Sequence, residues 1–173
     1  DALVPILVAT LAAGTPLVYA GLGELIVEKS GVLNLGVEGM MLVGAVTAFA
    51  VAAKTGHPWL GVGCGIAAGA ALALVFAVLS LTLMANQVAT GLALSLFGVG
   101  LSAFVGLDYV SVVIDGIKPT VSATLADLPV VGKLVFGHGP LVYLSLVLFA
   151  LVHWFLFRTR GGLILRAVGE APA

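Results

Sequence analysis

Two polar residues that could do chemistry lie in an apolar stretch near the beginning of the chain. The segment from Ser30 to Ala45 is apolar and glycine-rich, yet it contains Asn34 and Glu38. On a helix, their four-residue spacing puts both side chains on one face, one turn apart. A carboxylate at membrane depth is costly unless it faces a protein interior or a watery cavity. We therefore expect an interrupted or tightly packed helix that lines a pathway. In the alternative, Glu38 is solvated at the cytoplasmic interface and only ends a helix.

Composition indicates that a membrane surrounds this segment. Of the 173 residues, 61% are hydrophobic and 9% are charged, and the mean hydropathy is +1.25. Soluble domains carry about 25% charged residues. The net charge of −1 argues against nucleic acid as a partner. The expected fold class is all-α: a polytopic transmembrane helical protein with about five membrane-crossing helices and one or more broken or re-entrant segments. Because the chain stops after a basic loop, we expect it to be a fragment of a longer protein.

The spans follow from the apolar segments, and we expect one membrane domain over residues 1–173. The expected spans are residues 3–22, 33–53, 60–81, 88–107 and 140–157. In the first span, Gly14 and Pro16 predict a kink or an unwound turn. The long loop, residues 108–139, is expected to be external and to contain a partly re-entrant amphipathic piece.

The orientation follows from positive charge beside the fifth span. Arg158, Arg160 and Arg166 cluster there, and such clusters mark the cytoplasmic side. With five spans, the beginning of the chain is outside and its end is cytoplasmic. The polar connection at 24–31 is then inside as well, as is the short one at 84–87.

Small residues recur every four positions on two of the spans. Gly44, Ala48 and Ala52 share a face of the second span. The third span carries a longer ladder, which consists of Gly61, Gly65, Gly69, Ala73 and Ala77. Such ladders predict faces on which helices pack closely. Static packing is the simpler interpretation, and a moving interface is the alternative.

Signatures of an enzyme are missing. Gly132-Lys133 is followed by Leu134, so there is no P-loop. The His, Cys and acidic residues show no metal-ligand spacing, and nothing pairs a nucleophile with a base. His153 is expected to be an interfacial or packed histidine. We therefore expect no enzyme, metal or cofactor, and any energy for transport would have to come from an ion gradient or from a separate ATP-hydrolysing partner.

Two stretches together resemble the membrane permease subunits of ABC-type importers, in the branch that handles nucleosides and simple sugars and is related to ribose and branched-chain amino acid permeases. They are residues 23–45 and residues 158–170. Residues 86–94 and 129–136 are similar to that family as well. The resemblance implies that later helices of a longer permease are missing from this chain.

The resemblance implies a cytoplasmic coupling loop at residues 158–173. Its short coupling helix, at about 162–170, would dock into a groove on an ATPase subunit. Leu163, Ile164, Val168 and the stem of Arg166 could fill that groove. The candidate coupling residues are Gly162, Leu163, Arg166, Gly169 and Glu170. Ala171 departs from the family, which often has Asn before the following Pro. Without the family, these arginines would be read as topology-setting charges.

The resemblance also implies a substrate pathway between membrane helices, near the bilayer midplane. A nucleoside or sugar needs neutral hydrogen-bonding groups and an apolar or aromatic wall. The candidate pathway residues are Asn34, Glu38, Met41, Asn86, Gln87 and Phe97. Met40 could add to the wall.

The implied location is the cell (inner or plasma) membrane. The implied protein partners are ATP-binding cassette ATPase subunits, a second permease subunit (identical or different) and an extracytoplasmic substrate-binding lipoprotein or periplasmic protein. The ATPase subunits would bind the ATP. The lipid bilayer surrounds the permease. A secondary transporter or channel fragment, with Glu38 as an ion or proton site, remains the alternative. Branched-chain amino acids also remain possible substrates.

Overall fold

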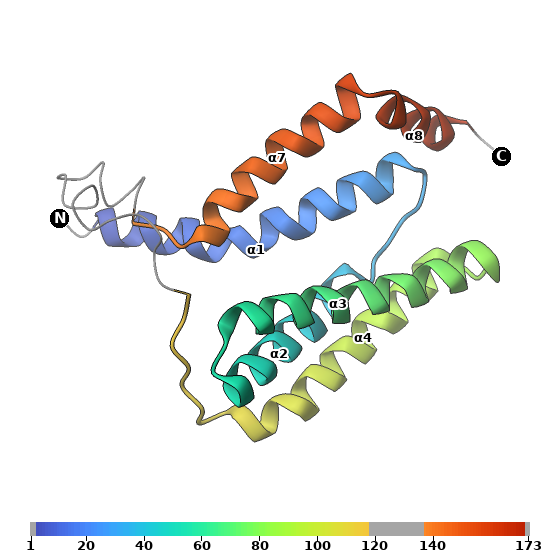
Figure 1. Cartoon of the computed structure of the whole chain (residues 1–173). Helices are drawn as coiled ribbons and strands as arrows, with labels where there is room; N and C mark the ends of the chain where they lie inside the picture. Colours follow the sequence, from blue (N-terminus) through green and yellow to red (C-terminus); the bar gives the residue numbers. More distant parts are fainter. Residues whose placement is uncertain (1–2, 118–136, 172–173) are drawn as a thin grey trace. The chain divides into compact units, whose positions relative to one another are not determined.

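The computed structural model describes residues 3–117 and 137–171, and this part of the chain is all-helical (Figure 1). Five helices are long and apolar enough to cross a membrane. They are α1 (Leu3–Lys29), α2 (Val37–Thr55), α3 (Pro58–Ala77), α4 (Gln87–Gly106) and α7 (Pro140–Arg158). The shorter helices are the π-helix η1 (Val78–Thr82), the 3₁₀-helix η2 (Leu107–Tyr109) and α8 (Arg160–Glu170). The all-α, five-helix expectation is confirmed.

The helices form two compact units. The first contains residues 1–31 and 117–173, and therefore α1, α7 and α8. The second contains residues 32–116, and therefore α2, α3 and α4 with the two short η helices. The expected single membrane domain is thus made of two units. We call them the α1–α7–α8 unit and the α2–α3–α4 unit.

The first helix differs from its expected span. It continues to Lys29 instead of ending at Leu22, so most of the expected connection at 24–31 is helical. It also remains helical through Gly14 and Pro16, so the predicted unwound turn is wrong. A proline removes only one helix hydrogen bond, and in apolar surroundings the other backbone groups have no better partners than the helix itself.

The second helix begins later than expected, at Val37 rather than residue 33. Residues 32–36 are not helical. Asn34 therefore lies outside the helix that carries Glu38, and the prediction that the two share a helix face is wrong. At its other end, α2 stops at Gly56, which has a left-handed backbone with φ of 70°. Pro58 then begins α3, where its fixed φ suits the first turn.

Small residues let α2 and α3 pack backbone to backbone. A Cβ atom added to Gly65 would lie 2.7 Å from the carbonyl oxygen of Gly44, and one added to Gly61 would overlap the carbonyl oxygen of Ala48. Gly44 faces Gly65 while Ala48 faces Gly61, so the two helices run antiparallel. The prediction that these small residues form close-packing faces is confirmed.

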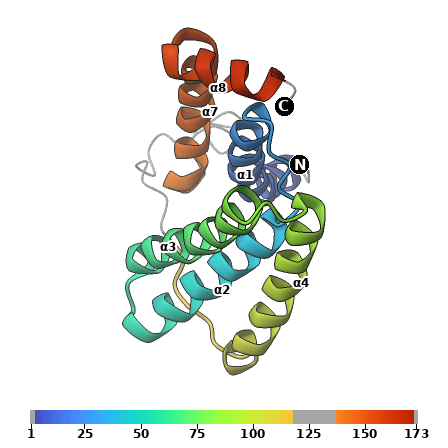
Figure 2. The same cartoon turned by 90° about the vertical axis from the view of Figure 1, so that its right-hand side faces the viewer.

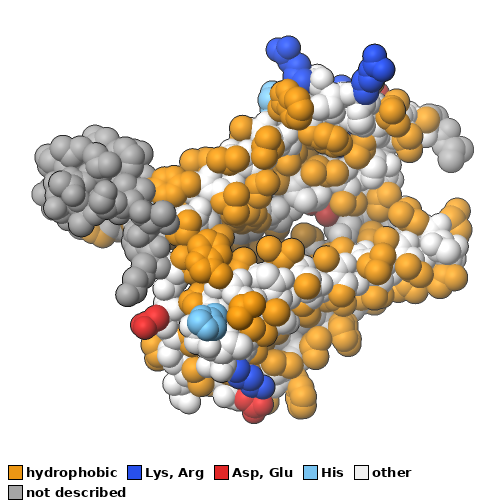
Figure 3. Space-filling view, viewed as in Figure 1, with side chains coloured by type: hydrophobic (Ala, Val, Ile, Leu, Met, Phe, Trp, Pro, Cys, Tyr) orange, Lys and Arg blue, Asp and Glu red, His pale blue; other side chains and the backbone are white. Residues whose placement is uncertain are grey.

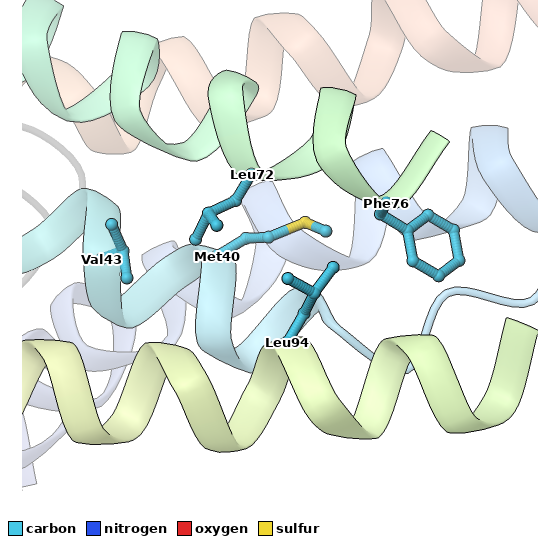
Figure 4. Close-up of a cluster of buried hydrophobic side chains, with 5 residues drawn as sticks. All are labelled: Met40, Val43, Leu72, Phe76 and Leu94. Atoms are coloured by element: carbon cyan, nitrogen blue, oxygen red, sulfur yellow. The ribbon is translucent and has the colours of Figure 1, made fainter. Parts of the chain in front are cut away.

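The core of the α2–α3–α4 unit is a small apolar cluster (Figure 4). Its buried side chains are Met40 and Val43 from α2, Leu72 and Phe76 from α3, and Leu94 from α4. Most other apolar side chains are exposed, as Ile66 and Leu96 illustrate. In Figure 3, hydrophobic atoms cover the sides of the helices, while Lys and Arg atoms gather near helix ends. This surface suits contact with lipid or with other membrane helices.

The α1–α7–α8 unit is held together by contacts of α1 with both other helices. The Tyr19 hydroxyl of α1 donates a hydrogen bond to the carbonyl of Leu141 in the first turn of α7 (2.7 Å). After α7 the chain turns at Thr159, and α8 leads from the end of α7 to the end of α1 (Figures 1 and 2). Much of the long loop, including residues 129–136, lies outside the described residues, and so does most of the region where a re-entrant piece was predicted.

Candidate functional site

The non-helical residues 32–36 lie along the first turns of α4. The backbone N–H of Leu33 donates to the Gln87 Oε1 atom (2.8 Å). The Ser95 hydroxyl donates to the carbonyl of Leu35 (2.8 Å). Side chains of α4 therefore satisfy backbone groups that no helix satisfies, which is required wherever irregular backbone lies at membrane depth. We call residues 32–36 the entry segment of α2.

Two glycines bring the entry segment and α2 against the backbone of α4. A Cβ atom on Gly91 would lie 2.8 Å from the backbone nitrogen of Leu35, and one on Gly98 would overlap the backbone of Gly39. Gly91 contacts the entry segment and Gly98, later in α4, contacts α2. The entry segment with α2 therefore runs parallel to α4. Ser95 is two turns into α4, about 12 Å along its axis. The entry segment therefore lies beside the first part of a membrane-length helix.

Asn34 is buried, with 7% of its surface exposed, and it organises the entry segment. Its Oδ1 atom accepts a hydrogen bond from the backbone N–H of Gly36 (2.9 Å), which is a local turn typical of Asn. Its Nδ2 atom lies 3.7 Å from the Met40 sulfur, a weak acceptor. These partners show that Asn34 fixes how the chain enters α2. Met40 itself is buried in the core cluster, so it does not form the wall of a pathway within this unit.

Glu38 is exposed in the first turn of α2. A negative charge is favourable there because the helix macrodipole leaves partial positive charge at its N-terminus. The geometry fits the alternative in which Glu38 lies at the end of a helix.

The other candidate pathway residues lie on α4 and α2. Asn86 caps α4, since its side chain accepts a hydrogen bond from the backbone N–H of Ala89 (3.0 Å). Gln87 is the residue that holds the entry segment. Met41 is half-buried on α2, and Phe97 is exposed on α4. Among the described residues, no group of three or more His, Cys, Asp and Glu side chains could hold a metal ion.

The candidate coupling helix is α8, and its two faces differ. Leu163, Ile164 and Val168 are about 60% exposed on the outer face. The inner face consists of Gly162, Leu165, Arg166 and Gly169, which are buried or half-buried. An apolar outer face and a charged residue on the inner face reverse the usual pattern of a surface helix.

The beginning of α8 is fixed to α7. The Thr159 hydroxyl caps α8 by accepting from the backbone N–H of Gly162 (3.1 Å), and it donates to the carbonyl of Phe155 (2.6 Å). A Cβ atom on Gly162 would overlap that same carbonyl. Farther along, the Arg166 guanidinium carbon lies 5.0 Å from the centre of the Phe157 ring, a cation–π contact.

The end of α8 is fixed to the end of α1. A Cβ atom on Gly169 would overlap the carbonyl oxygen of Lys29 and would lie 2.9 Å from the backbone nitrogen of Gly31. Gly31 has a φ of +83°, a conformation that favours glycine. This contact brings the end of α1 and the end of α8 together.

Sequence reasoning missed Ser95, Gly91 and Gly31. Nothing local in the sequence shows that Ser95 and Gly91 meet the irregular segment at residues 32–36. Gly31 lies in the glycine-rich segment from Ser30 to Ala45, whereas its partner, Gly169, lies near the end of the chain.

Comparison with known proteins identifies the family. The family model described as "Branched-chain amino acid transport system / permease component" matches residues 6–173. A protein of Haloferax volcanii named "Putative glucose ABC transporter permease protein" is 50% identical over 168 residues, which cover 95% of this chain and 51% of that protein.

Two bacterial relatives are more distant. The guanosine ABC transporter permease protein of Bacillus subtilis is 35% identical over 95% of this chain and 55% of its own length. The nucleoside ABC transporter permease protein of Lactococcus lactis subsp. cremoris is 31% identical over 91% of this chain and 53% of its own length. The chain thus spans about half the length of the curated relatives it matches, and no solved structure matches it significantly. The resemblance noted in the sequence is confirmed: the chain is a multi-pass membrane protein that belongs to the family of permease components of branched-chain amino acid transport systems.

Proposed function

We propose that this chain is part of the membrane-spanning permease subunit of an ATP-driven importer for nucleosides or simple sugars. The family match supports a permease, and the names of the relatives, which specify glucose, guanosine and nucleosides, support the substrate class. The observation that carries the proposal is α8, a short helix beside α7 whose exposed face is apolar.

The outer face of α8 docks on a separate ATP-binding cassette ATPase. Leu163, Ile164 and Val168 enter a groove of that subunit, and burying them there supplies the affinity. The exposed Glu170 lies at the rim. Gly162, Arg166 and Gly169 face α7 and α1, so they hold the helix in place rather than contact the ATPase.

The substrate pathway runs beside the start of α2. Asn34, Asn86 and Gln87 shape it by fixing the entry segment and the first turn of α4. Glu38, Met41 and Phe97 are the candidates for substrate contact, since Glu38 and Phe97 are exposed and Met41 is half-buried. A neutral, polar substrate with an apolar face suits such a set.

In the proposed orientation, α8 lies in the cytoplasm and the beginning of the chain lies outside. Arg158 and Arg160 stand beside the end of α7, as expected for a cytoplasmic loop. The contact between Gly169 and Gly31 supports a position of the end of α1 on the same, cytoplasmic side of the membrane as α8. The remaining partners are a second permease subunit, which can be identical or different, and an extracytoplasmic substrate-binding lipoprotein or periplasmic protein.

The direct test is co-purification of the ATPase with the full-length permease. Leu163→Glu puts a charge in the apolar contact, so we expect the ATPase to be lost, whereas Leu163→Met keeps the apolar surface and retains it. Equal recovery of the ATPase with both variants would contradict the docking face.

A second candidate function is a secondary transporter or channel in which Glu38 is an ion or proton site. The observation that favours it is the exposed carboxylate of Glu38 at the start of α2. In that case, Glu38→Gln abolishes gradient-driven uptake, and ATP depletion has no effect. Our proposal expects uptake that stops when ATP is depleted and that survives Glu38→Gln.

A further inference from the structure

We propose that the contact between Gly169 and Gly31 is the route by which movement of α8 reaches α1. This inference rests on the proposed function, because it assumes that α8 docks on an ATPase. It assigns Gly169 and Gly31 as positioning residues for transport. Neither is expected to touch substrate or ATP.

The contact is made by backbone atoms alone. A Cβ atom on Gly31 would lie 3.1 Å from the Gly169 Cα atom, and one on Gly169 would overlap the Lys29 carbonyl oxygen. No flexible side chain lies between the two helices at this point. A displacement of α8 therefore cannot be absorbed by side-chain rotation and must move the end of α1 or break the contact.

The contact joins elements that are distant in the sequence. At its beginning, α8 is continuous with α7 through Thr159, so those two helices are already linked by the chain. The end of α8 has no direct covalent link to α1, so the contact between Gly169 and Gly31 is what connects these two helix ends. From Gly31 the chain passes directly into residues 32–36, the entry segment of α2, which α4 holds through Gln87.

The α8 helix offers a matched set of glycines for a test. At position 161, an added Cβ atom comes to 3.3 Å from the far edge of the Phe155 ring, which can shift, and is in ordinary contact with the Thr159 hydroxyl at 3.9 Å. At position 169 it meets the backbone of residues 29 and 31. Gly161→Ala and Gly169→Ala are therefore the same chemical change on the same helix, and only the second separates α8 from α1.

The experiment uses the full-length permease with its ATPase and binding protein in liposomes. We expect Gly169→Ala to keep ATPase co-purification, since Leu163 and Ile164 remain exposed. Uptake and substrate-stimulated ATP hydrolysis should fall about tenfold, as expected from overpacking a tight contact. Gly161→Ala should retain both activities.

Gly31 is left unchanged in this test, because its φ of +83° strains any residue with a Cβ atom whatever happens at the contact. Normal uptake by Gly169→Ala would overturn the inference. Loss of ATPase binding by Gly169→Ala would also overturn it, because the contact would then only hold α8 in its fold. ATPase binding that survives Leu163→Glu would instead reject the docking face, so the two failures are distinguishable.

Discussion

Gly98 of α4 lies against Gly39 of α2 so closely that neither position has room for a methyl group. In a membrane, helices gain little from burying apolar surface, so their association depends on van der Waals contact at short range. Glycines provide that contact here on both sides of α2, with Gly61 and Gly65 on α3 and with Gly98 on α4.

A first prediction concerns this contact. Gly98→Ala should destabilise the protein by about 1–3 kcal/mol, because the added methyl group overlaps the α2 backbone. Thermal unfolding of the purified full-length protein in detergent measures the effect. Gly100→Ala is the control, since a Cβ atom there meets nothing within 4 Å. A Gly98→Ala variant as stable as the Gly100→Ala variant would contradict the contact.

Gln87 supports the second prediction. Gln87→Leu removes the acceptor for the Leu33 N–H and should cost about 0.5–1.5 kcal/mol of stability, because that N–H loses its protein partner. Gln87→Glu keeps an acceptor, and a negative charge is favoured at a helix N-terminus. Thermal unfolding of both variants distinguishes them, and equal melting temperatures would show that the hydrogen bond contributes little.

At the scale of elements, the start of α4 shows how capping and substrate contact can be separated. Asn86→Ala should lower stability by about 1 kcal/mol through loss of the cap, whereas Asn86→Ser keeps a capping oxygen and should be nearly neutral. Uptake by the Asn86→Ser variant is the decisive measurement. We expect it to remain normal, and strong loss of uptake without loss of stability would mean that Asn86 binds substrate.

The sequence predicts the helices well because their signals are local. Apolar length, Pro58 at a helix start and Gly56 after a helix end are each visible within a few residues. The close-packing faces of α2 and α3 are visible as well, since small residues recur at the helical period.

The entry segment could not be predicted in the same way. Asn34 and Glu38 have the spacing of one helix face, but hydrogen bonds with the side chains of Gln87 and Ser95 hold the backbone of residues 32–36 in a non-helical form. Those partners are more than fifty residues away in the sequence. The inner position of Arg166 depends likewise on Phe157, which a helical pattern alone does not place.

At the scale of the whole molecule, the topology gives a further prediction. Position 55 follows the second span and should be outside, whereas position 28, in the last turn of α1, and position 171, after α8, should be cytoplasmic. Single cysteines can be introduced as Thr55→Cys, Glu28→Cys and Ala171→Cys in a Cys64→Ala background. A membrane-impermeant maleimide should label only the first in intact cells.

Two results of this labelling have different meanings. Labelling of positions 28 and 171 from outside, with position 55 protected, would reverse the proposed orientation and remove α8 from any cytoplasmic ATPase. Labelling of positions 28 and 171 from opposite sides would contradict the contact between Gly31 and Gly169.

The close glycine contacts of α2 with α3 and α4, which we call the glycine seams, also determine where substitutions can raise the stability of this protein. Since α2 touches both neighbours through its backbone, a larger side chain has no room at Gly39, Gly61, Gly65 or Gly98. Other helical glycines face open space, and these are Gly14, Gly21, Gly23, Gly63, Gly100 and Gly106. Alanine at each should add roughly 0.5–1 kcal/mol by restricting the unfolded chain, so a thermostabilised form for purification can be assembled from these positions while the seams are left untouched.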